Sequence, residues 1–134
     1  MNKLENWQQT SQIAKQKKRP VVLMVDRSDC PYCRRVEGEF FSAIFASGQF
    51  DERAIFAKIS IDSGETVISG TGEVIATQAF LAPYKASLTP TVLFIDGDKA
   101  ELAEKIIGLT TPDYYGFYLE RSINQAIARV NSPA

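Results

Sequence analysis

A short apolar segment that leads into two closely spaced cysteines constrains the fold of this chain more than any other feature. Residues 21–25 are all apolar and predict a buried strand, and a polar turn follows at residues 26–29. Cys30 and Cys33 then enclose the dipeptide Pro-Tyr where a helical pattern begins. A C-x-x-C motif between a strand and a helix is typical of a thiol–disulfide redox site.

The position of the two cysteines suits this chemistry. We expect Cys30 at the N-terminus of the helix, where unpaired backbone N–H groups and the helix dipole stabilise a thiolate. Pro31 suits the first helical position, because it lacks an N–H group and its φ angle is already helical. Cys33 lies one turn further on, within disulfide reach. Such placements lower a thiol pKa from about 8.5 to roughly 3.5–7.5. We therefore expect Cys30 to be solvent-exposed, partly ionised and nucleophilic.

The composition argues against several classes of function. The 134 residues include 15 basic and 16 acidic side chains, and this net charge of −1 gives no electrostatic basis for binding nucleic acid or acidic membranes. The chain has no histidine, so Cys–His and Ser–His catalysis are excluded. Two cysteines cannot complete a tetrahedral zinc site, and we expect neither a metal nor another cofactor. No apolar run approaches the roughly 18–20 residues of a membrane span.

Hydrophobic periodicity predicts one α/β domain that covers residues 1–134. Helices are expected at residues 3–18, 33–48, 78–84 and from 111 onward. Strands are expected at residues 20–26, 54–62, 91–96 and 102–107, the last two as a hairpin. The glycine-rich segment 63–75 is expected to form a small excursion or a hairpin. Parallel strands joined by helices and closed by a hairpin indicate a three-layer α/β arrangement.

Two of these helices carry more detailed expectations. The helix after Cys33 should have one wide apolar face, made of Val36, Phe40, Phe41, Ile44 and Phe45. The last helix should begin with Pro112 at its first position and with the Thr111 hydroxyl as its cap.

The chain resembles thioredoxin-fold proteins over nearly its whole length. The resemblance rests on C-P-Y-C at residues 30–33 after a strand, on Tyr84 five residues before Thr89-Pro90-Thr91, on the hairpin, on Gly108 and on a C-terminal helix. It implies a thioredoxin-like α/β/α sandwich with a central mixed sheet, here with an extra N-terminal helix. The frame is similar to bacterial thioredoxin-related, SoxW-like and thiol–disulfide interchange proteins, many of which are periplasmic.

The resemblance also assigns residues around the cysteine pair. It implies that Pro90 follows a cis peptide bond and packs beside the pair, although most X–Pro bonds are trans and only about 5–6% are cis. It further implies that the backbone of Thr89 pairs with a substrate strand. Pro31 and Tyr32 would shape the docking surface and set the redox potential.

One residue departs from the family pattern. Thioredoxins usually hold a buried aspartate six residues before the first cysteine, and Met24 occupies that position here. Asp26 and Asp29 are nearer to the pair, but we interpret them as exposed turn or cap residues. Glu37 lies four residues after Cys33, on the same helical face. It is either a proton carrier for the pair or a plain surface glutamate.

Three functions fit these observations. The leading one is a thiol–disulfide oxidoreductase that exchanges disulfides with protein substrates through Cys30 and Cys33 and with an upstream redox partner in electron transport. The Pro-Tyr dipeptide is typical of glutaredoxins and suggests a glutathione-dependent reductase instead. The third possible function is a non-catalytic interaction module with a buried structural disulfide. The polar Arg34-Arg35 and the charged turn before Cys30 argue against it, because they favour exposure of the pair. We expect a monomer, in the periplasm or alternatively in the cytoplasm, and the direction of electron flow stays open.

Overall fold

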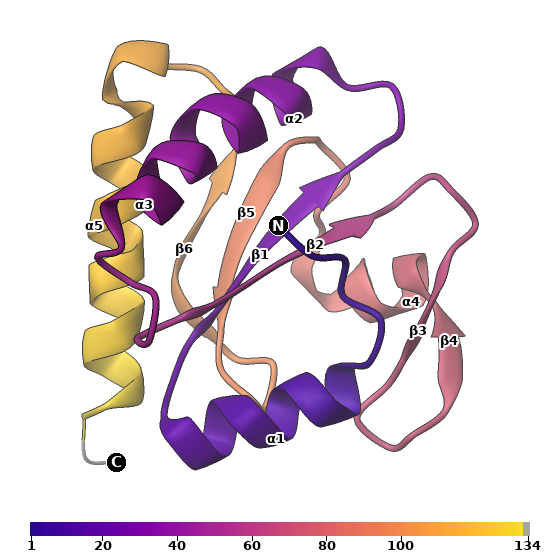
Figure 1. Ribbon diagram of the computed structural model, residues 1–134. Helices are drawn as coiled ribbons and strands as arrows, with labels where there is room; N and C mark the ends of the chain where they lie inside the picture. The colour runs from indigo at the N-terminus through magenta and orange to yellow at the C-terminus, as the bar shows by residue number, and fades with distance from the viewer. Residues whose placement is uncertain (133–134) are drawn as a thin grey trace.

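A four-stranded mixed sheet forms the centre of the computed structural model, which describes residues 1–132 (Figure 1). The strand order is β2-β1-β5-β6, where the strands are β1 (Val21–Asp26), β2 (Ile55–Ser60), β5 (Thr91–Ile95) and β6 (Glu101–Ile107). The pair β1–β2 is parallel, whereas β1–β5 and β5–β6 are antiparallel. The predicted mixed sheet with its terminal hairpin is confirmed.

Helices cover both faces of this sheet, and alternate residues of the central strands face them. On one face, Val22 and Met24 of β1 pack against α2 (Pro31–Arg35), α3 (Ser42–Ser47) and α5 (Pro112–Val130). On the other face, Leu23 and Val25 pack with α1 (Trp7–Lys17), α4 (Thr77–Leu81) and the short 3₁₀ helix η2 (Ala82–Tyr84). Figure 1 shows α5 and α2–α3 on one side and α1 on the other. The three-layer α/β/α sandwich is therefore confirmed.

The N-terminal helix is present but begins later than predicted. Residues 3–6 were expected to be helical, whereas α1 begins at Trp7 and the Asn6 side chain caps it by accepting a hydrogen bond from the Gln9 N–H group (3.1 Å). The preceding residues are extended and pair with β2. The Leu4 N–H group donates to the Lys58 carbonyl oxygen (2.8 Å), and the Lys58 N–H group donates to the Asn2 carbonyl oxygen (2.9 Å). The extended pairing with β2 therefore replaces the first predicted turn.

The helix that follows the cysteines contains a π-helical segment, η1 (Val36–Phe41), between α2 and α3. It ends at Gly48 (φ 66°), as predicted. A π turn holds more residues than an α turn, so it rotates the following residues around the axis. Phe41 and Ile44 are buried as expected, but Phe45 is 37% exposed. Phe45 lies at the edge of the predicted apolar face, where its ring packs against those of Phe41 and Phe56.

The remaining segments follow the predicted pattern with one exception. Within residues 63–75 an antiparallel hairpin forms from β3 (Thr66–Ile68) and β4 (Val74–Ala76), which confirms one of the two expectations for this segment. The last helix begins at Pro112, as predicted. Thr111 occupies the N-cap position, but its hydroxyl makes no capping hydrogen bond, so that expectation is wrong.

Candidate redox site

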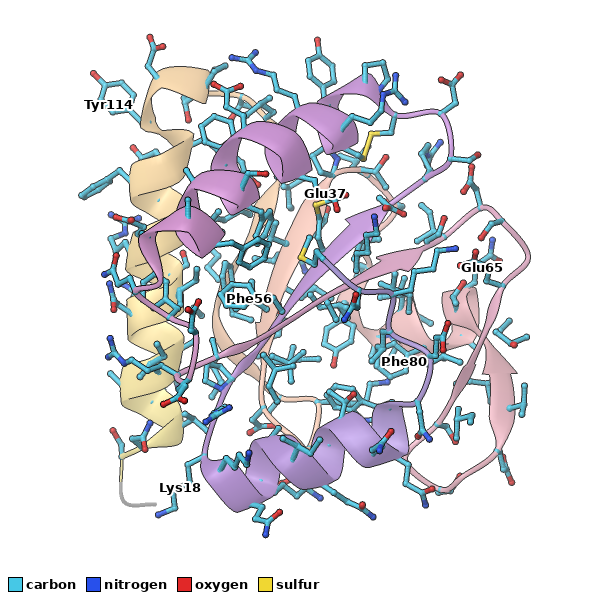
Figure 2. All side chains as sticks on the ribbon, in the orientation of Figure 1. Lys18, Glu37, Phe56, Glu65, Phe80 and Tyr114 are labelled. Carbon is cyan, nitrogen blue, oxygen red and sulfur yellow. A yellow bond between two sulfur atoms is a disulfide. The ribbon has the colours of Figure 1, made fainter. Side chains whose placement is uncertain are left out.

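The two cysteines form a disulfide at the N-terminus of α2. Cys30 is the N-cap residue, Pro31 takes the first helical position, and the Cα atoms of Cys30 and Cys33 are 5.2 Å apart. The Cys33 N–H group donates to the sulfur atom of Cys30 (3.1 Å). Figure 2 shows the disulfide in yellow where the helix meets the preceding loop. The strand, turn and helix thus place this pair as the sequence predicts.

Both cysteines are more buried than the sequence suggests. Cys30 is 6% exposed and Cys33 is 4% exposed, and both pack in the apolar cluster that contains Met24 and Val36. The expectation that Cys30 is open to solvent is therefore wrong. As the N-cap residue, Cys30 turns its sulfur atom toward the helix backbone. Tyr32, by contrast, is 61% exposed. The surface here is formed mainly by residues around the disulfide rather than by the sulfur atoms.

The loop before β5 lies against the disulfide. The hydroxyl oxygen of Thr89 is 3.5 Å from the sulfur atom of Cys30, and the Thr89–Pro90 peptide bond is cis. The Gly108 N–H group donates to the carbonyl oxygen of Pro90 (2.7 Å) and holds this loop against the end of β6. Leu88 is 64% exposed at its tip. Residues far apart in the sequence therefore form one surface around the cysteine pair.

A hydrogen-bond anchor fixes the turn that carries Cys30. The carboxylate of Asp62 accepts hydrogen bonds from the Ser28 N–H group (3.0 Å) and the Ser28 hydroxyl (2.7 Å), and also from the Ser60 hydroxyl (3.1 Å). The bonds from Ser28 favour the charged carboxylate, so they hold the pKa of Asp62 below its ordinary value. The end of β2 thereby positions the start of α2.

A cluster of charged groups lies between the π-helical segment and the sheet. The Nζ atom of Lys58 is 3.1 Å from both carboxylate oxygens of Glu37. Glu37 is only partly exposed and lies on the sheet side of the helix, where Figure 2 labels it. It therefore takes part in an ion pair with Lys58. Whether it carries protons remains a prediction.

Asp26 is the residue whose environment the sequence did not indicate. It ends β1 and is half-buried, on the same face as Val22 and Met24, so the expectation of an exposed turn residue is wrong. Burial raises the pKa of Asp26, and the positive charge of Lys58 opposes this rise. The alternation along β1 was the available signal, because it puts residue 26 on the face that α2 covers. Asp29 is exposed, as expected.

Residues 1–132 contain neither a cluster of metal-ligating side chains nor a helix that could span a membrane. No three His, Cys, Asp or Glu side chains in this range come together as a metal site would require. None of the helices in the same range has both the length and the apolar character to cross a bilayer.

Comparisons with known proteins agree with this geometry. The thioredoxin-like domain family matches residues 7–122. Comparison with curated proteins gave no match. A thioredoxin from Fasciola hepatica superposes with a TM-score of 0.62 at 19% identity, covering 94% of this chain and 99% of its own. The DsbH oxidoreductase gives 0.67 at 16% identity, covering 92% and 86%. The reduced periplasmic thioredoxin SoxS from Paracoccus pantotrophus gives 0.53 at 18% identity, covering 81% and 99%. These structures share the fold, and the family match shows that the chain belongs to the thioredoxin-like domain family.

Proposed function

We propose that the protein is a thiol–disulfide oxidoreductase that acts on protein disulfides through Cys30 and Cys33. The observation that carries the proposal is the disulfide at the N-terminus of α2 with the hydroxyl of Thr89 beside it. The helix N-terminus provides backbone N–H groups, and one of them already donates to the Cys30 sulfur. These groups stabilise a thiolate at Cys30 once the disulfide is reduced.

The exchange proceeds in two displacements. The Cys30 thiolate attacks one sulfur of the substrate disulfide, which forms a mixed disulfide and releases the other substrate sulfur as a thiolate. The Cys33 thiolate then attacks the Cys30 sulfur, which restores the Cys30–Cys33 disulfide and releases the second substrate thiolate. Two electrons pass to the substrate, and the released thiolates take up two protons. An upstream dithiol partner reduces the pair again, and reversal of the same steps oxidises a dithiol.

The substrate docks on the exposed residues around the pair. Tyr32 and Leu88 provide apolar side chains that are more than half exposed on either side of the disulfide. Pro31 and Thr89 line the surface between them, with Pro90 buried beneath it, and the Thr89 backbone offers its polar groups to an extended substrate segment. The burial of Cys30 implies that the substrate sulfur reaches it along the side of Thr89.

The acidic cluster supplies the proton transfer that Cys33 requires. We assign Glu37 as a proton carrier, and we add Asp26 because its raised pKa brings it closer to the working pH of a general base. The two acids share Lys58, which contacts Glu37 directly and interacts with Asp26 through its charge. Both should therefore affect the pH dependence of thiol exchange.

Insulin reduction with two single-cysteine variants tests the proposal. We expect Cys30→Ser and Cys33→Ser each to lower the dithiothreitol-driven reduction of insulin to the uncatalysed rate. Only Cys33→Ser should accumulate a mixed disulfide with the substrate, because it keeps the attacking thiol and lacks the resolving one. If both variants reduce insulin as fast as the parent, the proposal is wrong. If both trap substrate equally, the roles of the two cysteines are wrong.

The burial of both sulfur atoms favours one competing function, an interaction module with a structural disulfide. The reduced protein distinguishes the two. A redox site should give one rapidly alkylated thiol whose rate reports a pKa below about 8.5. A structural bridge should give two thiols that react only after unfolding. A glutathione-dependent reductase would instead reduce a glutathione mixed disulfide strongly and insulin weakly.

We further propose that the protein works as a monomer in the periplasm, with the cytoplasm as the alternative, and takes part in electron transport. A fold shared with the periplasmic SoxS supports this location. The reduction potential of the pair tests the direction of electron flow. A potential near that of thioredoxin, about −270 mV, indicates a reductant, and one near about −120 mV indicates an oxidant.

A further inference from the structure

A cavity of about 360 Å³ opens beside the loop that contacts the disulfide. Its walls include Arg27 from the turn before Cys30, Ile61 after β2, and Gln78, Leu81, Lys85 and Ser87 from α4 and the segment after it. Ser87 is two residues before Thr89, whose hydroxyl contacts the Cys30 sulfur. Two residues span at most about 7 Å, so this cavity lies within a few residues' length of the redox pair.

Hydrogen bonds join the walls of this cavity. The Arg27 guanidinium donates to the carbonyl oxygen of Ser87 (3.3 Å), and the Gln78 side-chain amide donates to the carbonyl oxygen of Ile61 (2.9 Å). These bonds connect the turn of Cys30 with the segment before Thr89, and the end of β2 with α4. The cavity is therefore held in shape by residues from three separate parts of the chain.

The charged groups that line the cavity are both positive. Arg27 and Lys85 are exposed, and neither forms an ion pair within residues 1–132. Arg27 has five N–H donors, of which one is used by Ser87, so others remain for an anion. Two acidic residues adjoin the wall in sequence: Asp26 is half-buried at the end of β1, and Asp62 already accepts three hydrogen bonds from Ser28 and Ser60. The protein as a whole has a net charge of −1, so this positive charge is local.

We propose that this cavity binds a carboxylate of the substrate, on the segment that flanks its disulfide. The inference rests on the proposed oxidoreductase function and adds a substrate class to it. Arg27 holds the carboxylate through its planar guanidinium group, and Lys85 adds a second positive charge. Ile61 and Leu81 contact the aliphatic part of the bound residue. The carboxylate comes either from an acidic residue of a protein or from glutathione, and the chemistry is the same for both.

Paired peptide disulfides test the proposal. Two symmetric peptide disulfides differ only in Glu or Gln residues beside the cysteine, and the pre-reduced protein reduces each in a single turnover. We expect the parent to react about three to ten times faster with the Glu peptide, because charged hydrogen bonds at a partly exposed site contribute about this much. At about 1 M salt this ratio should approach one.

Two variants assign the preference to the cavity. In the double variant Arg27→Gln with Lys85→Gln, the reduction rates of the Glu and Gln peptides should become about equal. This expectation holds even if both absolute rates change. Lys17→Gln removes one exposed positive charge at the far end of α1 and should keep the parent ratio. A ratio that survives the double variant, or an equal fall in Lys17→Gln, would overturn the subsite, as would a parent ratio of one both in the peptide pair and in the glutathione pair described next.

The remaining outcomes identify the source of the carboxylate and separate the oxidoreductase proposal from the subsite proposal. Glutathione disulfide is compared with its tetraethyl ester, in which all four carboxylates are esterified. A preference in this pair but not in the peptides identifies glutathione as the source, and the reverse identifies acidic protein segments. A parent that reduces none of these disulfides overturns the oxidoreductase function and the subsite together, whereas equal rates on all of them overturn the subsite alone.

Discussion

Lys58 holds the carboxylate of Glu37 through both of its oxygen atoms, at 3.1 Å each. Lys58 lies on β2 and Glu37 on the π-helical segment that follows the cysteines. The ion pair therefore connects the helix that begins at the cysteines (α2, η1 and α3, here called the redox helix) to β2, the outer strand of the sheet. Asp26 lies in the field of the same pair, and its burial is the larger influence on its pKa. The cluster thus contains Glu37, which is paired with Lys58, and Asp26, whose pKa is raised by burial.

Replacing Asp26 by Asn should stabilise the protein at neutral pH. Burial raises the pKa of Asp26 in the folded state, so the folded protein holds this proton more tightly than the unfolded chain, where the pKa is about 3.9. This tighter binding of the proton stabilises the folded protein fully below the pKa of the unfolded chain. The stabilisation is lost as the pH rises through the raised pKa of the folded state. We expect Asp26→Asn to gain up to about 1 kcal/mol at pH 7 after allowing for solvent screening.

Urea denaturation across the pH range measures this effect. The difference between Asp26→Asn and the parent should shrink as the pH falls toward about 4. The exposed Asp29→Asn is the matched control and should leave the stability profile unchanged. A less stable Asp26→Asn at pH 7 would show that the attraction to Lys58 outweighs the cost of burial.

Removing the hydroxyl of Thr89 should make the reduced Cys30 thiol less reactive. The hydroxyl oxygen lies 3.5 Å from the Cys30 sulfur and can donate to the thiolate. Thr89→Val keeps the shape of the side chain and removes this donor. We expect a higher pKa for Cys30 and roughly three- to fivefold slower alkylation at pH 7. Thr71→Val, in the turn of the β3–β4 hairpin, should alkylate at the parent rate. An unchanged pH profile in Thr89→Val would contradict the prediction.

The bond between Asp62 and Ser28 should make the turn before Cys30 sensitive to acid. Hydrogen bonds from Ser28 hold the pKa of Asp62 below its ordinary value, so this contribution is present above about pH 4. It is lost as the pH falls through the folded pKa. Amide hydrogen exchange should show that the protection of the Ser28 N–H group falls in that range. Asp62→Ala should lack this protection at every pH, and equal protection in both proteins at pH 7 would rule out the anchor.

Adding a methyl group at Gly97 should loosen α1. A Cβ atom there would lie 2.6 Å from the Cγ atom of Lys15 and 2.9 Å from the backbone oxygen of Ser11. The same contact includes a hydrogen bond from the Ser11 hydroxyl to the Gly97 carbonyl oxygen (2.9 Å). Because the backbone of α1 cannot yield as a flexible side chain can, Gly97→Ala should cost about 1–3 kcal/mol in thermal or urea unfolding.

A second glycine provides the control for this substitution. A Cβ atom at Gly38 meets nothing within 4 Å. Gly38→Ala should therefore be neutral or stabilising by up to about 1 kcal/mol, since alanine favours helix. If both variants lose the same stability, the contact with α1 is not the cause.

The local features of the site could be predicted from the sequence. Cys30 and Pro31 occupy the helix N-terminus because strand, turn and helix signals follow one another within a few residues. The distant features could not. The approach of Thr89 to Cys30 joins residues 59 apart, and only the family resemblance pointed to it. The burial of Cys30 depends on how α2 packs on the sheet, which no local pattern reports.

Two further misses have the same physical origin. Asp26 is half-buried at the end of β1 and interacts through its charge with Lys58 and Glu37, which are distant in sequence, whereas a sequence read one segment at a time treats it as a turn residue. The first residues of the chain follow helical spacing, yet Leu4 is extended because the edge of β2 offers it hydrogen-bond partners. The π-helical segment at Val36–Phe41 carries no recognised sequence signal.

The pairing of the first residues with β2 also protects the protein from its own copies. The Lys58 N–H group donates to the Asn2 carbonyl oxygen (2.9 Å), and the Lys58 carbonyl oxygen accepts from Leu4, so both backbone groups of this residue in the outer strand are occupied. An unoccupied strand of this kind is a template for aggregation. Removal of residues 1–5 by proteolysis, with the Asn6 cap retained, would leave these groups of β2 free to pair with a strand of another molecule while the redox pair stays in place.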